Sequence, residues 1–501
     1  MAETKQGPPL HVVVFPWLAF GHIVPFLELA EQLARRGHFV TFVSTPRNIA
    51  RLRPVPGREL SPRIRLVGLP LPAVDGLPDG AESTNDVPPE KVELLKVAFD
   101  GLAGPVASFL AEACAGSAGG EGHGRRPDWI ILDFAHSWLP PVAEQHDVPC
   151  ALFLIFPAPF VAFLGPKAAN DAHPRTAAED FTVPPPWIPS ASPSLAFHLH
   201  EARPIAGRFR QPNASGTSDM DRFWETERRC RLVVCRSSRE VDGPAICDLL
   251  PDLYGKPVLP LGLLAPYDAA AVAAHHGAGA GDDDDGVVMR WLDAQPARSV
   301  LYVAFGSEAP LTPELVREVA LGLELAGVRF LWAFRGAAGG GGAGLLPAGF
   351  ERRVAGRGVV RVGWVPQVRV LAHAAAGAFL THAGWSSLVE GLLLGHPFVM
   401  LPLFGDQGLT ARLMAERGVG LEVPRRDDGD GDGSVVARED VAAAVRRVLV
   451  EKEGEAFARV AKELQRLLLD RERQEGYVDE LAGKLLQWRH REKAFQESKL
   501  L

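Results

Sequence analysis

The chain has 501 residues, of which 47% are hydrophobic and 23% charged, and its formal net charge is −8. It is longer than the about 250–300 residues that one hydrophobic core usually supports, so two domains are expected. The acidic balance argues against a nucleic-acid-binding protein, because phosphate backbones require clustered Lys and Arg.

The first half of the chain begins with the apolar run His11–Phe15, which is typical of a strand covered on both faces. A loop, PWLAFG, follows, and apolar residues at helical spacing then predict a helix from His22 to Arg36. The next strand is expected at Phe39–Ser44. This order predicts a doubly wound α/β sheet, with further strands near 64–68, 129–132, 151–155 and 232–235.

The run 150–165 is the one membrane candidate that the sequence offers. It is shorter than the about 20 residues of a membrane-spanning helix and contains Pro157 and Pro159, so a buried strand and a loop are expected. The N-terminus MAETKQGPPL has mixed charge and two prolines, which does not fit a signal peptide. The five cysteines form no CxxC pair, which argues against zinc or a disulfide framework and favours the reducing cytoplasm.

The second half of the chain restarts the same pattern. Residues 264–286 are rich in Ala, Gly and Asp and are predicted to be an interdomain linker, whose acidic run Asp282–Asp285 is expected to be solvated rather than metal-binding. A strand at 299–304, a Gly-Ser-Glu loop and a helix at Pro313–Ala326 follow, with strands near 330–334, 359–363, 377–381 and 398–401. The sequence thus predicts domains at 1–263 and 287–480 and a helical tail at 481–501.

A histidine and an aspartate are placed for acid–base chemistry in the first half. His22 stands at the predicted start of the first helix, after Phe20 and Gly21, and Asp133 follows the predicted strand 129–132. Carboxyl ends of parallel strands share one sheet edge, so the two side chains are expected there together. The helix dipole would keep the His22 ring a neutral base, and the Asp133 carboxylate would orient it. Taken singly, each residue also fits a structural role.

The segment from Trp364 to Gln407 carries the most specific signal. Trp364 offers a flat apolar face that suits a nucleobase, with packing in the core as the alternative. Gln367 beside it can both donate and accept hydrogen bonds. Glu390, early in a predicted helix, has a carboxylate suited to two vicinal ribose hydroxyls, although a surface glutamate favoured by the helix dipole shows the same pattern.

An anion site is predicted where the strand 377–381 meets the next helix. His382 follows the strand, and the run Gly384-Trp385-Ser386-Ser387 opens a helix whose free N–H groups and dipole attract phosphate. The helix is expected to start near the two serines, as capping residues, a role that uses the same donors as phosphate binding. The segment ends in Asp406 and Gln407, an acceptor and an amide that can bind sugar hydroxyls.

These motifs resemble, in length, order and spacing, the signature box of plant family-1 UDP-glycosyltransferases, and the family's Gly-His-x-x-Pro motif surrounds His22. The resemblance implies the GT-B fold, with two facing Rossmann-like domains and a cleft between them, and an inverting transfer from a UDP-sugar without a metal ion or another cofactor. It assigns the base to Trp364, Val365 and Gln367, the diphosphate to Ser307, His382, Gly384, Trp385, Ser386 and Ser387, the ribose to Glu390, and the sugar to Asp406 and Gln407.

Two positions depart from the family, and the first, Ala383 in place of Cys, is a minor change in size. Ser386 replaces an Asn that helps to hold the phosphates, and weaker donor binding is expected because the shorter hydroxyl would reach through water. Two polar loops, 44–48 and 69–88, resemble the branch that adds a sugar to an existing glycoside. Glu308 is a further feature of that branch, and we expect it to contact the acceptor or the donor sugar, with Phe20 and Gly21 also near the acceptor.

The resemblance therefore implies an enzyme that transfers glucose from UDP-glucose to a sugar of a flavonoid or terpenoid glycoside. We expect this enzyme to be monomeric and cytoplasmic, without membrane insertion. Two alternatives stay open: the same chemistry on an aglycone hydroxyl, and an inactive UDP-sugar binder. A nucleotide-dependent dehydrogenase fits the fold class but lacks the glycine fingerprint in the first turn of either domain.

Overall fold

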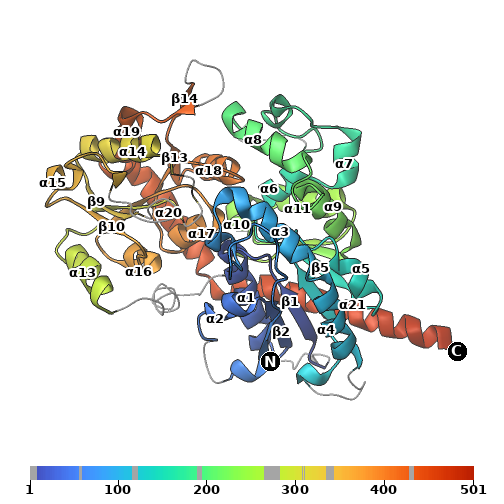
Figure 1. Ribbon diagram of the computed structural model, residues 1–501. Helices are drawn as coiled ribbons and strands as arrows, with labels where there is room; N and C mark the ends of the chain where they lie inside the picture. Colours follow the sequence, from blue (N-terminus) through green and yellow to red (C-terminus); the bar gives the residue numbers. More distant parts are fainter. Residues whose placement is uncertain are drawn as a thin grey trace. The chain divides into compact units, whose positions relative to one another are not determined.

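The computed structural model describes residues 8–55, 59–115, 122–188, 195–264, 282–306, 309, 311–334, 344–427 and 434–500. The chain forms two compact units. The first consists of residues 1–174, 207–264 and 472–501, and the second of residues 175–206 and 265–471. Each unit contains one parallel sheet, which confirms the predicted pair of Rossmann-like α/β domains (Figure 1).

The sheet of the first unit has the strand order β3-β2-β1-β4-β5-β6-β7, and all neighbours are parallel. Every residue of β1, β4, β5 and β6 is buried, because helices cover both faces. The strand order changes direction between β1 and β4, which makes the carboxyl ends of these two strands the expected binding edge. The strands are β1 (His11–Phe15), β2 (Phe39–Ser44), β3 (Ile64–Gly68), β4 (Trp129–Leu132), β5 (Cys150–Leu154), β6 (Leu232–Cys235) and β7 (Val258–Pro260).

Helices of several lengths connect these strands. The α-helices are α1 (Phe20–Arg35), α2 (Pro46–Ala50), α3 (Val92–Asp100), α4 (Ala103–Ala115), α5 (Leu139–Glu144), α6 (Ala158–Leu164), α7 (Lys167–Ala172), α9 (Asp219–Arg229), α10 (Arg239–Asp242) and α11 (Pro244–Tyr254). The short 3-10 helices are η1 (Ser61–Arg63), η2 (Thr84–Asp86), η3 (Pro89–Lys91) and η4 (Gly122–Gly124). The first helix, α1, buries its apolar face against the sheet through Ile23, Phe26, Leu29 and Leu33.

The prediction for the run 150–165 was half wrong. Its first part is the buried strand β5, but its second part is the helix α6 instead of a loop, and every residue of α6 is buried. Pro157 stands at the N-cap of α6 and Pro159 in its first turn, where a missing N–H breaks no intrahelical hydrogen bond. The two prolines therefore start this helix rather than prevent it.

One helical stretch, Pro89–Ala115, is long and apolar enough to cross a membrane by length and composition alone. It is divided into η3, α3 and α4, and its residues Leu95, Phe99 and Leu110 are fully buried. A core helix passes the same test, so the stretch is weak evidence for a membrane span.

The C-terminal helix α21 (Arg471–Leu500) packs on the first unit, although it ends the chain. Its Val478, Leu481 and Leu485 belong to the same core as β1 and β4, and the Trp129 indole N–H donates to the Leu485 carbonyl at 3.1 Å. In Figure 1 this red helix runs beside the blue strands β1 and β2. The first and last parts of the chain thus form one hydrophobic core.

The sheet of the second unit has the order β10-β9-β8-β11-β12-β13, again all parallel. Its order changes direction between β8 and β11, whose carboxyl ends form the second expected binding edge. The strands are β8 (Val300–Ala304), β9 (Arg329–Phe334), β10 (Gly358–Val362), β11 (Ala376–Thr381), β12 (Phe398–Met400) and β13 (Gly420–Glu422), and β14 (Arg426–Asp427) pairs antiparallel with β15 (Ser434–Val435).

Helices also cover the second sheet. They are α13 (Asp282–Asp293), α14 (Pro313–Ala326), α15 (Phe350–Arg353), α16 (Gln367–Ala372), α17 (Trp385–Leu393), α18 (Gln407–Glu416), α19 (Arg438–Leu449) and α20 (Lys452–Leu468). The 175–206 segment adds η5 (Ala178–Phe181) and the first part of α8 (Leu199–Arg210), which continues into the first unit.

The compact units and the expected domain ranges do not coincide everywhere. Residues 175–206 group with the second unit, and residues 472–501 group with the first. Residues 265–281 of the expected linker lie outside the described residues, and its last part, with the acidic run, opens helix α13.

Candidate functional site

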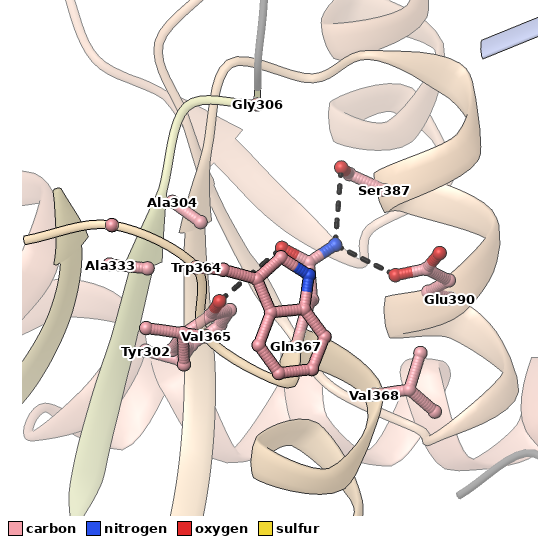
Figure 2. Close-up of a pocket in the computed structure, with 11 residues that line it drawn as sticks. Tyr302, Ala304, Gly306, Ala333, Trp364, Val365, Gln367, Val368, Ser387 and Glu390 are labelled. Atoms are coloured by element: carbon pink, nitrogen blue, oxygen red, sulfur yellow. Dashed lines mark hydrogen bonds between the residues drawn. The ribbon is translucent and has the colours of Figure 1, made fainter. Parts of the chain in front are cut away.

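A cavity of about 280 Å³ opens at the carboxyl ends of β8 and β10 in the second unit. Five residues expected to bind the nucleotide or the phosphates line it: Trp364, Val365, Gln367, Ser387 and Glu390. Gly306, which follows β8, lies at its edge (Figure 2). The structure thus brings together residues from three separate stretches of sequence.

Gln367, the first residue of α16, is the centre of the hydrogen bonds in this cavity. Its amide Nε2 donates to Glu390 Oε2 at 2.7 Å and to Ser387 Oγ at 3.4 Å. Its Oε1 accepts from the Tyr302 hydroxyl at 3.4 Å. Figure 2 shows the amide between α17 and the strand that carries Tyr302. The Glu390 carboxylate is therefore held in place before any ligand enters.

Trp364 is 43% exposed, whereas Trp129 and Trp332 are fully buried in the two cores. It follows the end of β10 by two residues, and its indole lies over Gln367 in the view of Figure 2. An exposed indole on the wall of a cavity is available for stacking on a planar ring. The alternative of a core tryptophan does not describe this side chain.

Tyr302 was not among the predicted site residues. Its ring is only 1% exposed inside β8, but its hydroxyl reaches Gln367 and the residue lines the cavity. A polar-tipped aromatic residue near the carboxyl end of the strand at the switch point is the signal that could have identified it.

His382 follows β11 and is buried between two glycines. A Cβ on Gly306 would lie 2.9 Å from the imidazole Nε2, and a Cβ on Gly384 would lie 2.5 Å from the same atom. Burial lowers the pKa of His382 to about 4, so the ring is neutral at pH 7. Because a glycine stands on each side, the ring sits at the backbone turn where helix α17 begins.

The predicted capping by the two serines was wrong. Helix α17 begins at Trp385 with Gly384 as its N-cap, so Ser386 and Ser387 are the second and third residues of the helix. The turn before it is set by Ala383, whose φ of 63° is left-handed and whose carbonyl accepts from Thr410 Oγ1 at 2.6 Å. This backbone turn, rather than a serine side chain, starts the helix, whose N-terminus favours an anion.

Asp406 and Gln407 stand at the start of α18, and neither lines the cavity described above. Gln407 is 3% exposed, and its Oε1 accepts from the N–H groups of Leu403 and Phe404 at 2.9 and 3.1 Å. The amide oxygen is thus used by the preceding turn, and the NH₂ group is the part that can donate to a ligand. Ser307 and Glu308, predicted for the phosphates and the acceptor, lie outside the described residues.

In the first unit, the structure places the predicted base and its acidic partner in contact. His22 Nδ1 lies 2.7 Å from Asp133 Oδ2, and the side chains are 13% and 1% exposed. The carboxylate also accepts the N–H groups of Trp17 at 3.0 Å and Phe134 at 2.7 Å. The residues follow β1 and β4, the strands that flank the change in strand order. A hydrogen bond from Nδ1 to Asp133 fixes the tautomer in which Nε2 carries no proton, the form that a general base requires.

Two phenylalanines that the sequence did not indicate flank the base. The His22 ring centroid lies 5.6 Å from that of Phe134 and 6.1 Å from that of Phe156. These rings give the base an apolar surround, in which the interaction with the Asp133 carboxylate is strengthened. Phe20 and Gly21, expected near the acceptor, precede His22 in helix α1, and Phe20 is partly buried while Gly21 is exposed.

The expectation of a loop at 44–48 was wrong: Ser44 ends β2, and residues 46–48 lie in helix α2, which Pro46 starts at its first position. Residues 44–51 contact the segment 69–88, which in turn contacts the residues that precede His22. Arg47 N–H donates to Glu82 at 2.7 Å, and Arg51 pairs with Asp86 at 2.6 Å. The next link is from Thr84 N–H to the Leu18 carbonyl, at 2.9 Å. The structure therefore joins residues 44–51 and the segment 69–88 into one wall that continues into the start of α1.

Comparison with known proteins identifies the family to which both units belong. A family model described as UDP-glucoronosyl and UDP-glucosyl transferase matches residues 275–470. The chain is 40% identical over 483 residues to UDP-glycosyltransferase 91C1 of Arabidopsis thaliana, covering 95% of this chain and 96% of that protein. It is 32% identical to the anthocyanidin-3-O-glucoside rhamnosyltransferase of Petunia hybrida, with 95% and 96% covered.

Among solved structures, Arabidopsis thaliana UGT89C1 complexed with UDP-L-rhamnose superimposes with a TM-score of 0.70 at 25% identity, covering 96% of this chain and all of that one. The likeness to whole-length relatives extends over both units. The chain therefore belongs to the plant UDP-glycosyltransferases, has their GT-B fold, and is a glycosyltransferase of a UDP-sugar donor and a small-molecule acceptor.

Proposed function

We propose that the protein is an inverting, UDP-glucose-dependent O-glucosyltransferase that adds glucose to a sugar of a flavonoid or terpenoid glycoside. The observation that carries the catalytic part is the 2.7 Å contact between His22 Nδ1 and Asp133 Oδ2. An inactive UDP-sugar binder has no use for an oriented base. The presence of this pair therefore favours an active transferase over that alternative.

In the proposed reaction, His22 Nε2 takes the proton of the acceptor hydroxyl, and the imidazolium that forms is stabilised by Asp133. The acceptor oxygen forms a bond to the anomeric carbon from the face opposite to UDP. The bond between that carbon and the phosphate oxygen breaks, and UDP leaves with the electron pair. Attack from the opposite face inverts the anomeric configuration.

The leaving diphosphate would be stabilised by the start of α17, with Ser387 near the cavity and the neutral His382 ring beside Gly306. The family resemblance adds Ser307 to this set. We propose that these groups, rather than a metal ion, balance the charge that develops on UDP.

Glucose as the donor sugar is proposed from Gln407, whose amide NH₂ is oriented by the two N–H groups that its oxygen accepts. Rhamnose is the specific competing donor, because two relatives are named rhamnosyltransferases and one similar structure contains UDP-L-rhamnose. Measuring transfer from UDP-glucose and UDP-rhamnose under the same conditions separates the two.

A glycoside acceptor is proposed for two reasons. The wall formed by residues 44–51 and 69–88 adjoins the start of α1 and carries the polar side chains of Arg47, Arg51 and Asp86. The Petunia relative is named for an acceptor that already carries glucose. An aglycone hydroxyl is the second candidate, because the aromatic rings around His22 suit a planar apolar acceptor.

We further propose that the enzyme acts in the cytoplasm as a monomer. The five cysteines are free thiols, and four of them are buried, as suits a reducing compartment. Size-exclusion chromatography with light scattering tests the monomer: a mass near 54.0 kDa is expected, and about twice that mass would refute it.

The test of the proposed function uses UDP-glucose and a matched pair of acceptors, a flavonoid or diterpenoid aglycone and its monoglucoside, with product masses as the readout. Hexose addition mainly to the monoglucoside is expected. Addition mainly to the aglycone would refute the proposal of a glycoside acceptor, but it would not contradict the proposed reaction mechanism. Lack of product from both, with UDP bound, would refute glucose transfer to this acceptor class.

A further inference from the structure

Glu201, in the 175–206 segment of the second unit, forms a buried ion pair with helix α18. Its carboxylate accepts two hydrogen bonds from the Arg412 guanidinium, at 2.7 and 3.4 Å, and one from His198 N–H at 2.8 Å. The Glu201 and Arg412 side chains are 11% and 12% exposed. A bidentate pair with this little exposure fixes the two elements relative to each other, unlike a solvated surface pair.

The Glu201 carboxylate lies directly on Gly408. A Cβ built on Gly408 would come within 2.5 Å of the carboxylate carbon, so any larger residue would displace Glu201 or the start of α18. Gly408 immediately follows Gln407 in the first turn of that helix. A negative charge is also favoured at a helix N-terminus.

The turn 402–407, which carries Asp406 and Gln407, is held at both ends by arginines. Arg425 donates to the Pro402 carbonyl at its beginning, and Arg412 acts through Glu201 on Gly408 at its end. Within the turn, the Gln407 side-chain oxygen accepts hydrogen bonds from the N–H groups of Leu403 and Phe404. The position of the Gln407 amide therefore depends on the 175–206 segment as well as on its own loop.

We infer that Glu201 is a positioning residue for the donor sugar, and that the 175–206 segment thereby helps to determine which UDP-sugar the enzyme uses. The inference rests on the proposed function of Asp406 and Gln407 as the sugar-binding pair. Glu201 and Arg412 are 211 residues apart in sequence, so no local pattern reveals the contact.

The test compares Glu201→Gln with the unchanged enzyme. The readouts are kcat/KM for UDP-glucose and UDP-galactose, which differ at one hydroxyl, and the Kd for UDP, which has no sugar. We expect Glu201→Gln to lower kcat/KM with UDP-glucose by roughly 10- to 100-fold, the cost of displacing the Gln407 amide by about 1 Å. The ratio of kcat/KM with UDP-glucose to kcat/KM with UDP-galactose should become smaller. The Kd for UDP should be unchanged.

Two further variants complete the experiment. Arg426→Ala removes an exposed ion pair with Asp440 in the same unit and should change none of these quantities. Gly408→Ala keeps the charges of Glu201 and Arg412 but pushes the Glu201 carboxylate away from α18, so it should have the same effect as Glu201→Gln. It also provides the test if the Glu201→Gln protein does not fold.

An equal loss with both donors, or a parallel loss of UDP binding, would show a merely structural role and overturn the inference. Gln407→Ala separates this result from a failure of the proposed function. If Gln407→Ala alters the ratio of kcat/KM for the two donors while Glu201→Gln and Gly408→Ala do not, only the positioning role of Glu201 is refuted. If Gln407→Ala itself leaves the ratio unchanged, the proposed sugar site and the inference fall together.

Discussion

Replacing Asp133 by Asn keeps the shape of the side chain but removes the charge that faces His22. The carboxylate accepts three N–H groups, from Trp17, His22 and Phe134. An amide can accept on one side only, so one of these donors must face the new NH₂ group. Asp133→Asn therefore changes both the charge and the ring orientation that the base needs.

The structure allows the size of this effect to be worked out. Two unit charges about 4 Å apart near a protein surface attract by about 4 kcal/mol, and His22 becomes charged as it takes the proton. With about 1.4 kcal/mol for each factor of ten, kcat should fall by roughly 10³-fold. UDP affinity should be unchanged, because the cavity with Trp364 and Gln367 belongs to the other unit.

The assay measures kcat under saturating UDP-glucose and acceptor, together with the Kd for UDP and the Tm. The Tm is the control, since a buried unsatisfied donor costs about 1–3 kcal/mol of stability. In a His22→Ala background, Asp133→Asn should have little further effect on kcat, because the two residues act as a unit. Full turnover by Asp133→Asn, or an additive loss in the double variant, would refute this account of the pair.

Three other predictions concern the donor cavity and the buried histidines. Trp364→Ala should weaken UDP binding by roughly 1–3 kcal/mol, measured by calorimetry, because an exposed stacking surface is lost; unchanged affinity would exclude stacking. Glu390→Gln should weaken binding of UDP by roughly 1.5–3 kcal/mol but that of 2′-deoxy-UDP less, and equal losses would exclude the ribose assignment. Burial lowers the pKa of His136, His382 and His396 to about 4, so the unfolded chain binds protons that the folded chain does not. Stability should therefore fall as the pH drops from about 6.5 to about 4, on the order of 3 kcal/mol per histidine, and a Tm that stays constant over this range would contradict it.

Much of the sheet could be predicted from apolar runs. β1, β2, β4 and β6 have the expected bounds, because a doubly covered parallel strand reads as a continuous apolar segment. β3 also has the expected bounds, although it is a largely exposed edge strand. β7 and β13 were not predicted, since each has only three residues and lies at a sheet edge. Helix α6 was missed because prolines at a helix start also resemble loop residues.

The site residues that belong to a sequence motif could be predicted. Those that are brought to the site by tertiary contacts could not. His22 and Asp133 follow strands that a doubly wound sheet must bring to one edge. Tyr302 belongs to a strand without a motif, and Glu201 reaches α18 across 211 residues. The packing of α21 on the first unit likewise depends on Trp129 and Leu485, which are 356 residues apart. No local sequence pattern identifies residues that are this far apart in the chain as contacting each other.

The most direct test of the account is a single variant, His22→Ala, measured for both UDP binding and glucosyl transfer. The account assigns the base to the first unit and the nucleotide to the second, so it predicts that transfer is abolished while the Kd for UDP stays unchanged. Retained turnover in His22→Ala would contradict the assignment of the base. A loss of UDP binding that matches the loss of transfer would contradict the assignment of the base and the nucleotide to different units.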